Sequence, residues 1–291
     1  MSETVVFATV SLHRRDTIRF IQFPEGLAPL LRNLLEASWT PGIREEKIYG
    51  GCALEFRMNR RPFGLSEDID TVNGRRLVRD IFDFLWVRGW RIVESLGHSQ
   101  NKGTKDTLIF RRDDGGDSHV ESSSAGIQVD PRQPRLDWMV VAMYSSDKIR
   151  FILDTAKARP RHPTLAQGED GDNELETPEP PAGQLVTGVK TILEKLHQLQ
   201  SGSWTHSSYE FKLKGRPWGG MGEETVKSRV LLLQLLALFD SLGWRSYAAV
   251  SQGTEFGDFK RPDTWYFVQP VDWVAGSPFN DTIRVSNSET C

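Results

Sequence analysis

Two glutamates and two arginines stand at matching places along the chain and are the first side chains to consider for chemistry. Glu55 lies on a predicted strand and Arg75 lies early in the helix predicted after it, and Glu210 and Arg229 repeat this arrangement. A guanidinium can bind a carboxylate through two parallel hydrogen bonds. The spacing therefore predicts that each glutamate pairs with its arginine and ties the strand to the helix. The alternative is that the arginines bind an anionic ligand in a cleft.

Basic and aromatic residues gather around the turn that follows each of these strands, and they form a second set of candidates. Cationic side chains beside an aromatic ring suit an acidic peptide of a protein partner, a small acidic ligand such as a phospholipid headgroup, or single-stranded nucleic acid. The formal net charge of −3 disfavours nucleic acid. The alternative is a solvated strand face whose aromatic residue lies in the core. The candidate ligand-binding residues are Arg57, Arg60, Arg61, Phe63, Arg75, Lys212, Lys214, Arg216, Trp218 and Arg229.

The sequence holds no arrangement typical of a catalytic or metal centre. The six histidines are scattered, and none stands at metal-ligand spacing from a cysteine or another histidine. Asp106-Thr107 and Asp263-Thr264 precede predicted strands and are typical of turns. The glycine-rich segment 219–222 lacks the lysine and Ser/Thr of a phosphate-binding loop. We therefore expect no cofactor and no metal ion, and the sequence leans away from an enzyme.

Composition places the chain among ordinary globular proteins. It has 291 residues, of which 38% are hydrophobic and 26% charged. Two cysteines cannot form a disulfide framework and fit a reducing compartment. No apolar run approaches the roughly 18 residues of a membrane-spanning helix. The sequence predicts a soluble protein of the cytoplasm or nucleus.

An internal duplication organises the elements that must position these side chains. The segment Glu55–Gly64, EFRMNRRPFG, recurs as Glu210–Gly219, EFKLKGRPWG. Three blocks repeat in the same order, which indicates that one unit was copied. The matching segments are 55–64 with 210–219, 71–95 with 225–249, and 106–110 with 263–267. A shorter motif around Asp-x-Ile-Arg occurs at 16–20, 147–151 and 281–285, each within a predicted hairpin.

Hydrophobic periodicity predicts hairpins, two amphipathic helices and further strands in each unit. Gly89 and Gly243 are predicted to end the second helix of their units, because a left-handed terminating residue favours glycine. The helix 223–242 is apolar nearly all round, so it is predicted to pack on its own sheet and also against the other unit. The fold class is α+β: two tandem repeats of a ββαβαββ-like unit, with mainly antiparallel sheets, helices on one face and a pseudo-twofold arrangement.

Segments poor in large apolar residues mark the boundaries between these parts. We predict a first repeat unit at 1–112, a flexible insertion at 113–136, a hairpin shared between the units at 137–155, an acidic Pro/Gly-rich disordered linker at 156–183, and a second repeat unit at 184–291. Residues 272–291 either close the second unit or begin a third, and the first reading is preferred because a lone third hairpin leaves an unpaired edge.

The resulting functional hypothesis is a non-enzymatic intracellular binding or scaffold protein. It would engage a protein or an acidic ligand through the groove between the units or through the basic and aromatic turns, and a homodimer is compatible with the sequence. One alternative is an enzyme whose site lies between the units and uses Glu55, Glu210, Arg75 and Arg229. The other is nucleic-acid binding through the arginines of the first unit, which predicts binding that falls steeply with salt.

Overall fold

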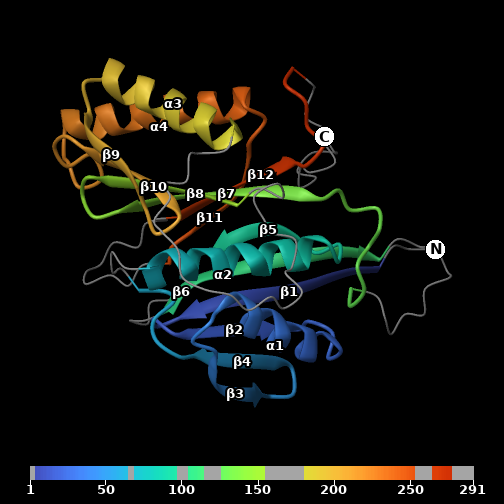
Figure 1. The fold of residues 1–291 in the computed structure, drawn as a ribbon. Helices are drawn as coiled ribbons and strands as arrows, with labels where there is room; N and C mark the ends of the chain where they lie inside the picture. The colour runs from blue at the N-terminus through green and yellow to red at the C-terminus, as the bar shows by residue number, and fades with distance from the viewer. Residues whose placement is uncertain are drawn as a thin grey trace, which may run out of the picture.

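The computed structural model describes residues 4–64, 69–96, 104–114, 126–154, 180–252 and 264–276. Most of the linker predicted at 156–183, part of the insertion predicted at 113–136, and residues 277–291 with the third hairpin motif lie outside these ranges. Within them the chain forms two units, each built on one six-stranded antiparallel sheet and two helices (Figure 1). The predicted α+β fold of two tandem units is thereby confirmed.

The two units share one element order, ββαββαββ. The first unit consists of β1 (Thr4–His13), β2 (Thr17–Ile21), α1 (Leu27–Ser38), β3 (Ile43–Tyr49), β4 (Ala53–Met58), α2 (Ile69–Trp86), β5 (Arg91–Leu96) and β6 (Thr104–Asp114). The second consists of β7 (Leu136–Tyr144), β8 (Lys148–Asp154), α3 (Pro180–Lys195), β9 (Leu199–Thr205), β10 (Ser208–Leu213), α4 (Glu223–Ser241), β11 (Arg245–Val250) and β12 (Thr264–Pro270). The strand orders, β3-β4-β2-β1-β6-β5 and β9-β10-β8-β7-β12-β11, correspond strand for strand.

This topology corrects two expectations. Each unit has one strand more than predicted, β3 or β9, placed after its first helix at the sheet edge. The hairpin expected at 137–155 to be shared belongs wholly to the second sheet, because β7 pairs with β12 and β8 pairs with β10. It is the second unit's counterpart of β1 and β2, and so each unit begins with its own hairpin.

Both second helices end as predicted. Gly89 and Gly243 have φ values of 80° and 81°, in the left-handed region that favours glycine. The residue after each glycine forms a backbone hydrogen bond to the last turn of the helix: Trp90 N–H donates to Leu85 O at 3.0 Å, and Trp244 N–H donates to Phe239 O at 2.9 Å. Such a bond satisfies a carbonyl that the helix end leaves open, and the Gly-Trp repeat therefore stops each helix and starts the next strand.

The helices cover the two sheets differently. One face of the first sheet packs on α1 and α2, and one face of the second sheet packs on α3 and α4 (Figure 1). The opposite face of the second sheet, with Trp138, Val140, Tyr266 and Val268, joins the core of the first unit. We call it the seam face. The second sheet is thus covered on both sides.

The helix buried on two sides is α2, not α4 as the sequence predicts. Helix α2 lies between its own sheet and the seam face, and Phe82 contacts the rings of Trp138, Tyr247 and Tyr266 at centroid distances of 6.2, 5.4 and 4.9 Å. Helix α4 buries only one stripe. The contacts between the units are therefore not equivalent, because helix α2 of the first unit meets the sheet of the second, whereas an exact twofold arrangement would make the same contact in both directions.

The last part of the predicted insertion has a defined position. Residues 126–135 form turns against the end of α2, where Asp130 N–H donates to Val87 O at 2.7 Å and Trp90 Nε1–H donates to Gly126 O at 3.2 Å. Trp86 Nε1–H also donates to Pro134 O at 2.9 Å. These bonds fix the approach of the chain to β7 and so help to set the second sheet on α2.

Candidate functional site

The face of the first sheet turned away from α1 and α2 carries the polar side chains of alternate residues. Since successive side chains of a strand point to opposite faces, the burial of Val10, Leu12 and Phe20 on the helix side places their neighbours on this other side. We call it the open face, because no element in the described ranges covers it. Its side chains include Phe7, Ser11, His13, Thr17, Arg19, Tyr49, Glu55 and Arg57.

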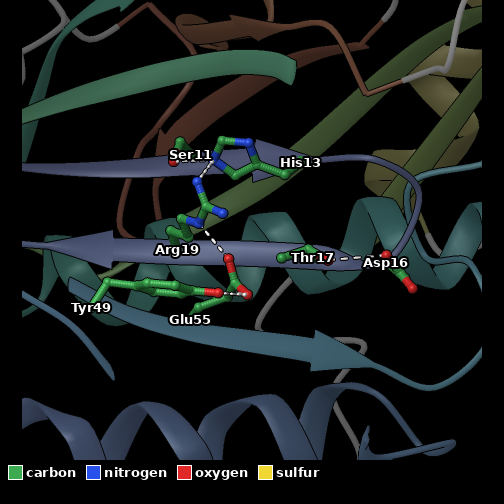
Figure 2. A network of polar contacts seen from close by, with 7 residues as sticks. All are labelled: Ser11, His13, Asp16, Thr17, Arg19, Tyr49 and Glu55. Carbon is green, nitrogen blue, oxygen red and sulfur yellow. Dashed lines mark hydrogen bonds and ion pairs between the residues drawn. The ribbon is translucent and has the colours of Figure 1, made fainter. Parts of the chain in front are cut away.

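A connected polar network crosses the open face over four strands (Figure 2). Arg19 on β2 is the direct cross-strand neighbour of Glu55 on β4, and its Nε–H donates to the Glu55 carboxylate. Tyr49 on β3 donates its hydroxyl to Glu55 Oε1 at 3.3 Å, and the Arg19 guanidinium lies 5.4 Å from the centroid of the Tyr49 ring. Arg19 and Tyr49 therefore both contact Glu55, and they also contact each other.

Ser11 and His13 extend this network on β1. Ser11 Oγ lies 2.9 Å from His13 Nε2, and Arg19 NH1 lies 3.5 Å from the same nitrogen. A guanidinium can only donate, so Nε2 is assigned as the acceptor and the ring proton is placed on Nδ1. Burial, and then the positive charge of Arg19, lower the pKa of His13 from 6.5 to about 4, against the opposing effect of Glu55.

The Ser11–His13 geometry resembles a nucleophile and its base, but its chemistry is unfavourable for catalysis. A general base works best with a pKa near the operating pH, whereas an imidazolium here is opposed by Arg19. Ser11 is also buried, so a substrate has poor access to its oxygen. The arrangement is suited to a neutral histidine that holds Arg19 in place.

Acidification is expected to lower the stability of the protein through the depressed pKa of His13. Above about pH 6.5 His13 is neutral in both the folded and the unfolded chain; as the pH falls towards about 4, the unfolded chain takes up a proton that the folded chain does not. The free energy of unfolding of the wild type should therefore fall more between pH 7 and pH 5 than that of His13→Gln. Chemical denaturation at both pH values measures this difference, and equal losses in the two proteins would contradict the depressed pKa.

The second unit repeats the central ion pair but buries it. Arg150 and Glu210 are direct cross-strand neighbours, with Arg150 NH2 2.5 Å from Glu210 Oε2, and Lys148 Nζ lies 3.3 Å from Glu210 Oε1. The side chain of Arg150 is 4% exposed and that of Arg19 is 36% exposed. The glutamates are alike, with Glu55 12% and Glu210 15% exposed. The two pairs therefore differ in the arginine, which is buried in the second unit and partly exposed in the first.

These pairs replace the ones predicted from the sequence. Glu55 binds Arg19 and not Arg75, and Glu210 binds Arg150 and not Arg229. Arg75 is buried and donates to Thr71 O at 3.1 Å within its own helix, and Arg229 is exposed and donates to Thr225 O at 3.0 Å. The alternating strand geometry joins the glutamate to the neighbouring strand, not to the helix.

The predicted basic and aromatic patch does not assemble as one surface. Phe63 is fully buried, and Trp218 is half-buried with its Nε1–H donating to Lys148 O at 2.8 Å. Arg57 binds Asp16 at 2.9 Å on the open face, and Arg60 lies 3.2 Å from Asp70. The remaining members are basic and exposed except for half-buried Lys212: Arg61, Lys212, Lys214 and Arg216. The aromatic rings thus belong to the packing of the turns.

The region between the units is filled by packed side chains. Trp138 Nε1–H donates to Asp83 Oδ1 at 2.9 Å, and Tyr266 donates its hydroxyl to Arg75 O at 3.2 Å. Asp106, predicted to form a turn, is buried on β6 and accepts the Ser251 N–H at 2.6 Å across the units. The predicted groove is therefore closed at these contacts, and Arg75 does not line an open site there.

Neither a metal-ligand cluster nor a membrane-spanning helix is found in the described ranges. No three or more His, Cys, Asp or Glu side chains there are placed to hold a metal ion. No helix in those ranges is both long and apolar enough to cross a bilayer.

Arg19 and Arg150 are the repeated site residues that the sequence analysis misses, and Phe7, Ser11, His13 and Tyr49 of the open face are missed as well. Arg19 and Arg150 both stand in the repeated Asp-x-Ile-Arg motif, and the repeated glutamate is also visible in the sequence. The sequence does contain a sign of this pairing, because both units repeat an arginine in the first hairpin and a glutamate in a later strand. Pairing them requires knowing that β2 neighbours β4, which the sequence alone does not establish.

Comparison with known proteins gives one family. The model of a single protein-domain family matches the chain over residues 6–111 and 172–268, with one matched segment in each unit. No curated protein and no solved structure matches the chain.

Proposed function

The chain belongs to this domain family, and from the unlike docking of its two units we propose that it is a non-enzymatic binding protein whose open face engages a helix of a partner protein. The interaction would use the sheet of the first unit as a platform. The polar network of Arg19, Glu55 and His13 would lie at its centre, with exposed apolar residues around it.

One observation carries the proposal: the corresponding face of the second sheet already holds a helix. Helix α2 lies on the seam face through Phe82, which contacts Trp138 and Tyr266. The repeat places Phe7 at the position of Trp138 and Ile109 at the position of Tyr266. The same framework, with the same Arg–Glu pair, is therefore available on the open face for a helix.

The chemistry of the open face defines the class of partner. Phe7 is 52% exposed and Tyr49 is 45% exposed, so both rings can contact a partner that lies on this face. Acidic Asp16 and Glu55 lie among basic Arg19 and Arg57, so the face carries no one-signed field. A helix with an apolar stripe fits it better than a polyanion, and this mixed charge disfavours the nucleic-acid alternative.

The proposal is tested by panning a phage-displayed library of amphipathic helical peptides against the immobilised full chain. Selected peptides should bind wild type at least about tenfold more tightly than Phe7→Glu, because a carboxylate buried against the apolar side chains of the peptide is left without a partner. Met221→Glu is the matched control, since Met221 is 88% exposed and lies outside the open face. Peptides that bind Phe7→Glu as well as wild type, or a library that yields no binder, would overturn the assignment.

The compartment belongs to the same proposal. A cytoplasmic or nuclear location is supported by the two cysteines of the chain, of which Cys52 is free.

A further inference from the structure

We propose that the helix bound by the open face is α4 of a second copy of this chain, so that molecules associate head to tail. This inference rests on the proposed function, because it names the partner of the same surface. The contact between molecules would repeat the contact between the two units of one molecule.

Helix α4 carries an uncovered apolar stripe. Val226 is 60% exposed, Val230 is 40% exposed and Leu233 is 66% exposed. With the exposed Ala237 they follow the three- and four-residue spacing that places side chains on one side of a helix. In the described ranges no element covers this stripe. Apolar side chains gathered in this way mark an interaction surface.

The repeat identifies what covers the same region of α2. Leu233, Leu236 and Ala237 occupy the positions of Arg79, Phe82 and Asp83. In the first unit Arg79 and Phe82 are buried, and Phe82 and Asp83 contact the seam face. In the first unit this face of α2 is therefore covered by the sheet of the unit that follows. The same face of α4 is not covered by a following unit in the described ranges.

One polar contact between α2 and the seam face is replaced on both sides by apolar residues at the corresponding positions of α4 and the open face. Inside the chain, Trp138 donates its Nε1–H to the carboxylate of Asp83. The counterpart of Trp138 on the open face is Phe7, and the counterpart of Asp83 on α4 is Ala237. Donor and acceptor are both replaced by apolar groups, so docking α4 on the open face of a second copy leaves neither group buried without a partner.

The contact between Phe82 and Tyr266 has an apolar counterpart in the proposed interface. Phe82 packs on Tyr266 inside the chain, and its counterpart Leu236 would pack on Ile109 of the second copy. The interface joins unlike surfaces, so each molecule keeps one free helix and one free sheet face. Such a heterologous contact extends into a chain of molecules unless rotation closes a ring.

The test uses the full chain and two variants that each block one side. Sedimentation velocity from about 1 µM to about 500 µM should show wild type growing in mass with concentration, because a contact with a micromolar Kd becomes occupied over this range. Leu233→Glu blocks the helix side and Phe7→Glu blocks the sheet side, so each variant alone should remain monomeric. Both residues are exposed, and circular dichroism melting checks that the variants fold.

Mixing the two variants separates this inference from its alternatives. Leu233→Glu keeps an intact open face and Phe7→Glu keeps an intact α4, so an equimolar mixture should form a one-to-one dimer and stop there. A wild type that self-associates while the mixture stays monomeric would overturn head-to-tail docking in favour of a like-with-like contact. A wild type that stays monomeric, while helical peptides still require Phe7, would overturn this inference and leave the proposed function standing; if the peptides do not require Phe7 either, both fall.

Discussion

Replacing Phe82 with alanine is expected to lower the free energy of unfolding by about 3–5 kcal/mol. The ring is fully buried and contacts four aromatic rings, Phe110 of its own sheet and Trp138, Tyr247 and Tyr266 of the second unit. Its removal therefore opens a cavity where the two units meet. Urea unfolding followed by circular dichroism measures the loss.

Leu236→Ala is the matched control, since Leu236 is the counterpart of Phe82 in the second unit. It is half-buried, so its truncation should cost less than about 2 kcal/mol. The measurement is made at low concentration, where association through α4 does not contribute. Equal losses for the two variants would contradict the finding that only α2 is covered on both sides.

Replacing Glu210 with alanine is expected to cost about 3 kcal/mol, and the same change at Glu55 about 1 kcal/mol or less. Glu210 binds Arg150 and Lys148, and Arg150 is almost fully buried, so the variant removes a carboxylate that stabilises a buried charge. Glu55 binds Arg19, whose side chain is 36% exposed and can be stabilised by water. Thermal and urea unfolding of both variants measure the difference.

A double variant checks the cause of that loss. Replacing both Glu210 and Arg150 with methionine removes the pair together, and buried ion pairs replaced by apolar residues are commonly neutral in stability. Glu210→Met with Arg150→Met should therefore recover most of the stability lost in Glu210→Ala. A double variant as unstable as the single one, or equal costs at Glu55 and Glu210, would show that burial of the pair is not what distinguishes the units.

The duplication and most elements are readable from the sequence because they depend on local rules. The Gly-Trp helix ends and the alternating strands need only the residues nearby. The edge strands β3 and β9 are missed because most of their side chains are exposed, and so they lack the apolar alternation that identifies a strand.

The packing of one unit against the other cannot be predicted from the sequence, because local patterns do not show which surfaces contact each other. Helix α4 has the more continuous apolar sequence, yet α2 is the helix buried on two sides and carries Arg75 and Arg79 in its buried part. Arg75 donates to Thr71 O of its own helix and Arg79 donates to the adjacent Asp80, and hydrophobic periodicity does not reveal that such charged side chains are buried. The same limit applies to the site: Arg19 and Glu55 are both repeated, but only the strand order makes them partners.

The central claim, that the open face is a helix-binding platform, is tested most directly by hydroxyl-radical footprinting of the full chain with and without a saturating helical peptide selected on it. The account predicts protection of Phe7 and Tyr49, with the modification of Met221 unchanged. Unchanged Phe7 and Tyr49, with protection confined to other surfaces, would contradict it.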